Sequence, residues 1–179
     1  FMIQLGAIAL LIEAGVEDAI ERGLRLIEHE LATYANLDGR IPELQEGDLW
    51  EGVDDDGRPF VEPDGVIISD PGHSLEFVGL ALKCIAAADG RATPREQQRL
   101  DAAQQRMPGL LVRNFENGYL PGPQGLSKAF DLATRTHLNT DMPWWNLPET
   151  IRAAASCLVS TTDEHQRATC LRIWRECHN

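Results

Sequence analysis

The stretch "SDPGHSLEFVGLALK", from Ser69 to Lys83, determines the predicted fold. Asp70 followed by Pro71 is a typical start of an α-helix, because Asp accepts hydrogen bonds from free backbone N–H groups and Pro needs no such partner. The helix that follows is apolar on nearly every side, which indicates that it packs against other elements over most of its surface. It nevertheless begins with His73 and Glu76, one turn apart. Ionisable side chains in such a helix need water, a partner or a function.

Helices of the same apolar kind are predicted near residues 1 and 143 as well, within the segments 2–12 and 147–159. Each of the three is followed by an amphipathic helix, and the second of these opens with the capping sequence "TPRE" at 93–96. A pair of helices that recurs about every 70 residues is typical of a stacked or toroidal repeat. We therefore predict an all-α, single-domain protein built from three helical hairpins. The hairpins are expected at about 1–70, 71–140 and 141–179.

The composition and the charge argue against several classes of protein. The chain has 179 residues, is 43% hydrophobic and 25% charged, and carries a net charge of −12, which argues against binding to nucleic acid or to an anionic membrane. No apolar segment approaches the ~20 residues that a membrane-spanning helix requires. The four cysteines form no CxxC pair, so we expect reduced thiols, no metal site and a cytoplasmic location.

The repeat is expected to place the chemically active side chains together. The apolar helices of such an array run in the same direction, so their N-termini and the long loops before them lie at one end. The segment "DPGHSLE" at 70–76 and the segment "DMPWWNLPE" at 141–149 would therefore line one pocket, opened by the acidic residues Asp70 and Asp141. We expect the functional site at this end.

His73 is expected near the third position of its helix, with its side chain at the helix mouth. The positive end of the helix dipole disfavours a second positive charge, so the sequence predicts a neutral imidazole near pH 7 that can accept a proton. Glu76 would lie on the same helix face and could fix the imidazole tautomer or handle a second proton. The alternative is an ordinary capped helix with a solvated histidine and glutamate.

Trp144, Trp145 and Glu149 are the candidates from the third apolar helix. Trp145 and Glu149 are four residues apart and would share one helix face. An aromatic ring beside a carboxylate suits a sugar, because the ring stacks on C–H groups and the carboxylate accepts hydrogen bonds from hydroxyl groups. The alternative is a pair of core tryptophans, with Glu149 stabilising the helix N-terminus.

The segments "DPGHSLEFVGLAL" and "PWWNLPETIRAA" together resemble the N-acylglucosamine 2-epimerase family, and the resemblance covers essentially the whole chain. It implies an (α/α)6 barrel that acts as a sugar epimerase or an aldose–ketose isomerase. It also implies removal of the proton at C2 of an open-chain sugar, with no cofactor and no metal.

The resemblance gives each candidate residue a role. It implies that His73 is a catalytic base and that Glu76 assists it. Trp145, with Trp144 beside it, would stack on the sugar. Glu149 would bind hydroxyl groups or adjust the charge of the site.

Members of that family are longer than this chain, and two of their residues, an arginine from the N-terminal half and a second catalytic histidine, have no counterpart in it. The three hairpins would then be half of an (α/α)6 toroid. A half-toroid leaves apolar helix faces uncovered, so we expect a homo-oligomer or a separate complementing chain, besides the small-molecule sugar, as partner. Two alternatives stay open. One is a glycoside hydrolase or lyase that uses Glu76 and Glu149 as paired carboxylates, and the other is a non-catalytic truncated homologue.

Overall fold

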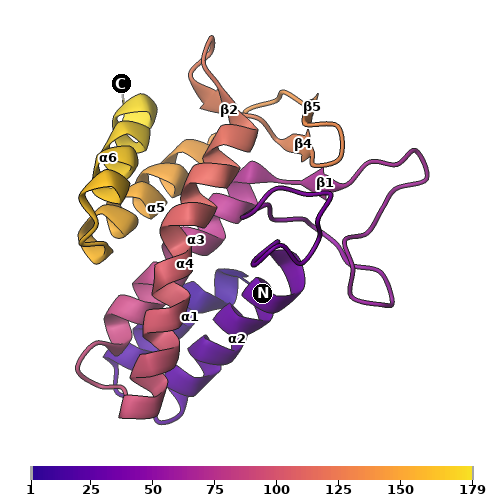
Figure 1. Cartoon of the computed structure of the whole chain (residues 1–179). Helices are drawn as coiled ribbons and strands as arrows, with labels where there is room; N and C mark the ends of the chain where they lie inside the picture. Colours follow the sequence, from indigo (N-terminus) through magenta and orange to yellow (C-terminus); the bar gives the residue numbers. More distant parts are fainter. Residues whose placement is uncertain (1, 179) are drawn as a thin grey trace.

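The computed structural model describes residues 2–178; Phe1 and Asn179, the ends of the first and third predicted hairpins, lie outside the described residues. The helices form three consecutive hairpins, and the two helices of each hairpin pack against each other (Figure 1). The helices are α1 (Met2–Glu13), α2 (Ala19–Tyr34), α3 (Pro71–Ala88), α4 (Pro94–Gly118), α5 (Asn146–Ser160) and α6 (Glu164–His178). The predicted helix pairs are thus present, whereas the half-toroid stays a prediction.

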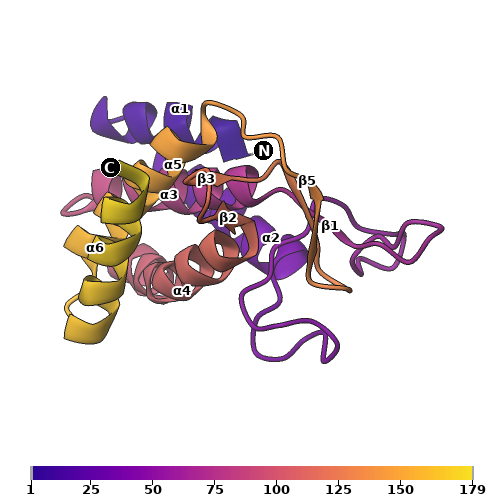
Figure 2. The same ribbon diagram turned by 90° about the horizontal axis from the view of Figure 1, so that it is seen from above.

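Helix α3 lies at the centre of the fold. It packs against both α1 and α5, and these three form an inner layer, with α2, α4 and α6 outside it (Figure 2). The core contains fully buried side chains from both layers. Among the largest are Leu24, Leu75, Leu100, Met107, Leu111 and Ile173. This central position explains why the sequence of α3 is apolar on nearly every side.

The predicted helix starts at Asp70 and Thr93 are confirmed. Asp70 Oδ1 accepts hydrogen bonds from the backbone N–H groups of Gly72 and His73, at 3.0 and 3.3 Å. Thr93 Oγ1 accepts from the N–H of Glu96 at 3.3 Å, and the N–H of Thr93 donates to Glu96 Oε2 at 2.8 Å. The two hydrogen bonds between Thr93 and Glu96 form the reciprocal capping box that the sequence "TPRE" predicts.

The predicted start of the third apolar helix near Pro143, opened by Asp141, is wrong. Helix α5 begins at Asn146, whose N–H donates to the carbonyl of Pro143 at 3.0 Å in the preceding turn. Pro148 explains the difference, because a proline is tolerated only in the first turn of a helix, and a start at Asn146 places it there. Asp141 is exposed and lies outside the helix.

Two small antiparallel sheets correct the all-α prediction. Within residues 2–178, β1, β4 and β5 form one sheet in that order, and β2 and β3 form a hairpin. The strands are β1 (Ile68–Ser69), β2 (Tyr119–Leu120), β3 (Gly125–Leu126), β4 (Ala129–Asp131) and β5 (Thr136–Asn139). Ile68 pairs with Asp131, so the sheet of β1, β4 and β5 joins the first long loop, residues 35–70 between α2 and α3, to the second long loop, residues 119–145 between α4 and α5. Strands this short show no alternation of side chains, and the partner of β1 is distant in sequence, so the sequence pattern does not reveal them.

A buried ionic cluster also holds the two long loops together. Asp48 is fully buried, and its Oδ2 atom accepts hydrogen bonds from Arg135 Nη1 at 2.7 Å and from the N–H of Gln45 at 2.9 Å. Its Oδ1 atom accepts from Asn117 Nδ2 at 3.0 Å, and Arg135 also donates to Asn117 Oδ1. We call these four residues the Asp48 cluster. Asp48 lies in the first loop and Arg135 in the second, so the cluster fixes both loops at the end of the molecule where α3 begins.

One face of α1 is uncovered. Ile3, Leu10 and Leu11 are 76, 57 and 41% exposed, although α1 packs against α3 on its other side. Large apolar side chains exposed together on one helix are typical of an interaction surface. None of the helices between residues 2 and 178 has the length and the apolar character that a membrane-spanning helix needs.

Candidate functional site

The first turns of α3 and α5 touch, and this contact brings the predicted site residues together. Gly72 lies against the side chain of the buried Asn146, and a Cβ atom at position 72 would clash with Asn146 Oδ1. The absence of a side chain at Gly72 therefore allows the two helices to approach closely. As a result, His73 and Glu76 of α3 lie at the same end of the molecule as Glu149 of α5.

The imidazole of His73 faces two carboxylates on its Nδ1 side. Its Nδ1 atom is 3.1 Å from Glu51 Oε2 and 3.4 Å from Asp70 Oδ2, and its side chain is 35% exposed. The hydrogen bond to Glu51 raises the pKa of His73 above its ordinary value, although burial acts in the opposite direction. The expectation that the helix N-terminus dominates and favours the neutral imidazole is therefore wrong in direction. The effect of the two carboxylates on this pKa is larger than the opposing effect of burial.

Glu51 is a site residue that the sequence analysis missed. It lies in the long loop after α2, and its N–H donates to the carbonyl of Ile68 at 3.0 Å. The preceding residue, Trp50, is buried and donates through its N–H to the carbonyl of Tyr34 at 3.1 Å. These backbone contacts hold Glu51 beside His73. No sequence spacing indicates such a pairing, because it depends on the path of a loop rather than on a helix period.

Glu76 and Glu149 form a second part of the site. Burial raises the pKa of Glu149, Arg152 lowers it through an ion pair within α5, and the negative charge of Glu76 raises it again. The two carboxyl groups are thus close enough to interact. The carboxylate that contacts the imidazole of His73, however, is Glu51 and not Glu76. A carboxyl group with a raised pKa, such as that of Glu149, is suited to hold and transfer a proton.

Lys128 is a second residue that the sequence analysis missed. It lies between β3 and β4, forms an ion pair with Asp70, and places its Nζ atom 6.0 Å from the centre of the Trp145 ring. Its positive charge lowers the pKa of His73, so it opposes the effect of Glu51. Folding of the second long loop brings Lys128 to this place, and no local motif marks it.

Trp144 and Trp145 are surface residues. They are 82 and 39% exposed, and their rings meet edge to face with centres 6.0 Å apart. The alternative that both are core tryptophans is therefore wrong. Exposed indole rings beside charged groups can stack on the C–H face of a sugar.

The site is suited to acid–base chemistry. Between residues 2 and 178, no group of three or more His, Cys, Asp or Glu side chains is placed to hold a metal ion. The side chains at this end of the molecule are a histidine beside two carboxylates, a further carboxyl group with a raised pKa, a lysine and two aromatic rings. Such a set can move protons and bind hydroxyl groups.

The fold and the site define an α-helical protein with an acid–base centre beside exposed aromatic rings. The model of the family N-acylglucosamine 2-epimerase (GlcNAc 2-epimerase) matches residues 9–179. The chain therefore belongs to this family, and the resemblance carried by the two motifs is confirmed. This membership supports a sugar epimerase or isomerase in general terms. Comparisons with curated proteins and with solved structures found no match.

Proposed function

We propose that the chain converts a sugar into its C2 epimer or into the corresponding ketose by removing the proton at C2. The observation that carries this proposal is the contact between His73 Nδ1 and Glu51, which leaves Nε2 without a hydrogen-bond partner among residues 2–178. The test is incorporation of deuterium at C2 when N-acetylmannosamine, mannose or glucose is incubated with the protein in deuterated water.

Glu51 is proposed to determine which nitrogen accepts the proton. A carboxylate accepts a hydrogen bond only from a protonated nitrogen, so the neutral imidazole carries its hydrogen on Nδ1 and keeps a lone pair on Nε2. When Nε2 takes a proton, the positive ring is stabilised by Glu51 and Asp70 on its other side, at 3.1 and 3.4 Å. His73 is therefore suited to act as a base through Nε2.

The proposed step begins with an open-chain sugar, whose carbonyl group at C1 acidifies the C2–H bond. This bond breaks, the proton moves to His73 Nε2, and the electron pair moves onto the carbonyl oxygen to form an ene-diolate. Lys128 supplies a positive charge near this anion. Protonation of the other face of C2 by water, with His73 then releasing its proton to the solvent, gives the epimer. Delivery of the proton from His73 to C1, together with transfer of the O2 proton to the O1 oxyanion, gives the ketose, and Glu149 is the group proposed to move that hydroxyl proton.

The other candidate residues are proposed to hold the sugar. Trp145, with Trp144 beside it, would stack on the ring or chain of the substrate, and Glu76 would accept hydrogen bonds from its hydroxyl groups. The family match does not favour the glycoside-cleaving alternative with Glu76 and Glu149 as paired carboxylates. The non-catalytic alternative predicts no deuterium at C2 in the same test.

Replacement of Glu51 with Gln is expected to lower the pKa of His73 and to shift the acid limb of the C2-exchange rate to lower pH. The hydrogen bond from Glu51 is the main cause that raises this pKa. The maximal rate is expected to fall by about 10-fold to 100-fold, because a glutamine fixes the tautomer less firmly. NMR titration of His73 and the pH profile of the exchange rate measure the two effects separately.

The matched control is Glu43→Gln, an exposed glutamate in the same loop. An unchanged titration of His73 in Glu51→Gln would contradict the assigned role.

The contact between His73 and Glu51 also affects the stability of the folded protein. Because the pKa of His73 is raised in the folded state, the contact contributes fully to the free energy of unfolding below about pH 6.5, the pKa of an unfolded histidine. The contribution is lost as the pH rises through the folded pKa.

The uncovered face of α1 is proposed to bind a second copy of the chain. This face presents Ile3, Leu10 and Leu11, and α1 contains one charged residue, Glu13 at its end. The net charge of −12 would make two copies of the chain repel each other, but few of these charges lie on α1. Burial of two such faces against each other removes apolar surface from water, at about 25 cal/mol per Å².

Sedimentation velocity at micromolar concentration is expected to show a species larger than the 19.9 kDa monomer. Leu10→Arg is expected to give the monomer, because it places a charge in the proposed interface. Val61→Arg, at a 52% exposed apolar residue in the first long loop, is expected to associate like the wild type. A wild-type monomer at all concentrations, or association only with a different chain, would contradict self-pairing.

A further inference from the structure

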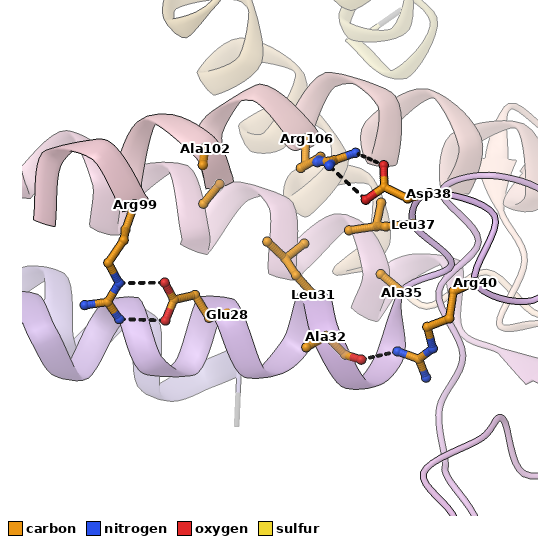
Figure 3. Close-up of a pocket in the computed structure, with 11 residues that line it drawn as sticks. Glu28, Leu31, Ala32, Ala35, Leu37, Asp38, Arg40, Arg99, Ala102 and Arg106 are labelled. Atoms are coloured by element: carbon orange, nitrogen blue, oxygen red, sulfur yellow. Dashed lines mark hydrogen bonds and ion pairs between the residues drawn. The ribbon is translucent and has the colours of Figure 1, made fainter. Parts of the chain in front are cut away.

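A groove of ≈ 510 Å³ lies between α2 and α4, and the arginines that line it are already engaged (Figure 3). Arg99 binds Glu28 through two nitrogens, at 2.7 and 2.6 Å, and Arg106 binds Asp38 at 2.9 and 3.0 Å. Arg40 donates to backbone carbonyl groups near the end of α2. A ligand in this groove would have to displace these contacts.

A second pocket, of ≈ 340 Å³, lies between α3, α4 and α5 and has a different character. Its charged lining residues are Lys83 and Arg152, both cationic. The other lining residues are uncharged: Leu82, Ala86, Gln104, Ser156, Val159 and Ser160. A pocket with two cations and no carboxylate among its described lining residues contrasts with a chain whose net charge is −12.

Neither cation of this pocket is fully satisfied by the protein. Lys83 is exposed and has no ion pair or side-chain hydrogen bond within residues 2–178. Arg152 pairs with Glu149 Oε2 through its Nη2 atom, whereas its Nε atom is buried and has no hydrogen-bond partner in the described part of the chain. A buried donor without an acceptor is unfavourable, so a ligand that supplies an acceptor at Nε gains free energy.

Gly79 of α3 provides the space for the guanidinium group. A Cβ atom at position 79 would lie 3.0 Å from Arg152 Nε and 3.4 Å from the backbone nitrogen of Ala153. A larger residue would force Arg152 or α5 to move. The contact between α3 and α5 is therefore shaped around an arginine whose Nε atom has no acceptor among residues 2–178.

We propose that this pocket binds a small oxyanion, the phosphate or carboxylate group of a low-molecular-weight ligand, between Lys83 and Arg152. The Nε–H group of Arg152 would donate to one oxygen of such an anion, and the ammonium group of Lys83 would neutralise its charge. The hydroxyl groups of Ser156 and Ser160 are further donors in the lining. The volume is within the range of small-molecule sites.

The proposed anion site is separate from the acid–base centre but connected to it. Lys83 follows His73 by ten residues on the same helix, which corresponds to roughly 15 Å along its axis. The connection is Arg152, which also contacts Glu149. An anion that binds Arg152 competes with this contact and therefore raises the pKa of Glu149 further.

Titration with inorganic phosphate at constant ionic strength is expected to shift the NMR signal of the Arg152 Nε–H group along a saturating curve. A parallel titration with acetate distinguishes a carboxylate ligand from a phosphate ligand, and saturation by either supports the site. Lys83→Gln is expected to weaken binding at least tenfold. Arg95→Gln, at an exposed cation of α4, is the matched control and is expected to bind like the wild type.

A shift that rises linearly to the highest concentration, or equal affinity of the wild type and Lys83→Gln, would overturn the proposal. Either result would show a general ionic effect rather than a site. Because no sugar is present, the result is independent of the proposed C2 chemistry. Failure of the C2-exchange assay therefore does not affect the phosphate titration, and failure of the phosphate titration does not affect the C2-exchange assay.

Discussion

Substitution of His73 by Ala is expected to slow exchange of the sugar C2 proton by about 10²–10⁴-fold, the range that a positioned general base contributes. The reason is that Nε2 of His73 is the proposed proton acceptor and that Nδ1 is already bound by Glu51. Proton NMR of the sugar in deuterated water measures the loss of the C2 signal directly. The substitution leaves the N-terminal cap of α3 in place, because Asp70 bonds to the backbone of the helix.

His165→Ala is the control for this experiment, since His165 is an exposed residue at the start of α6. It is expected to exchange at the wild-type rate. Exchange at the wild-type rate in His73→Ala would remove His73 as the base. No exchange in the wild type, with any of the sugars, would favour the non-catalytic alternative instead.

Substitution of Asp48 by Asn is expected to lower the free energy of unfolding by about 3 kcal/mol, since removal of one partner from a buried ion pair leaves the other uncompensated. Asp48 is fully buried and accepts hydrogen bonds from Arg135, Asn117 and the backbone of Gln45. An amide keeps the shape of the side chain but removes the charge opposite Arg135. Urea unfolding followed by circular dichroism measures the change.

Asp38→Asn is the matched control. Asp38 also pairs with an arginine, Arg106, but its side chain is 72% exposed, and exposed pairs contribute about 0–1 kcal/mol. Asparagine also tolerates the positive φ of 57° at this position. Equal, small effects of the two substitutions would contradict the idea that the Asp48 cluster holds the long loops.

The sequence predicts the parts of the fold that depend on neighbouring residues. The helix starts at Asp70 and Thr93 follow from a capping side chain and the proline after it, and both signals act within one turn. The start of α5 was placed too early, because two prolines, Pro143 and Pro148, offer competing local signals. Only the second is compatible with the helix that forms.

The sequence predicts less of the site, for a physical reason. Glu76 and Glu149 were identified because helix periodicity relates them to His73 and Trp145. Glu51 reaches the site through backbone contacts that depend on the tertiary structure. Lys128 arrives in the same way, through the second loop, and no periodic pattern marks a residue of this kind.

The placement of Glu51 has a consequence for adaptation. The position of the imidazole is set by α3, whereas its basicity is set largely by a carboxylate from a surface loop. A change in that loop can therefore retune the pH at which the site operates and leave the helix, its cap and its packing as they are. A protein built in this way can be fitted to a more acidic or more alkaline surrounding by changes outside its core.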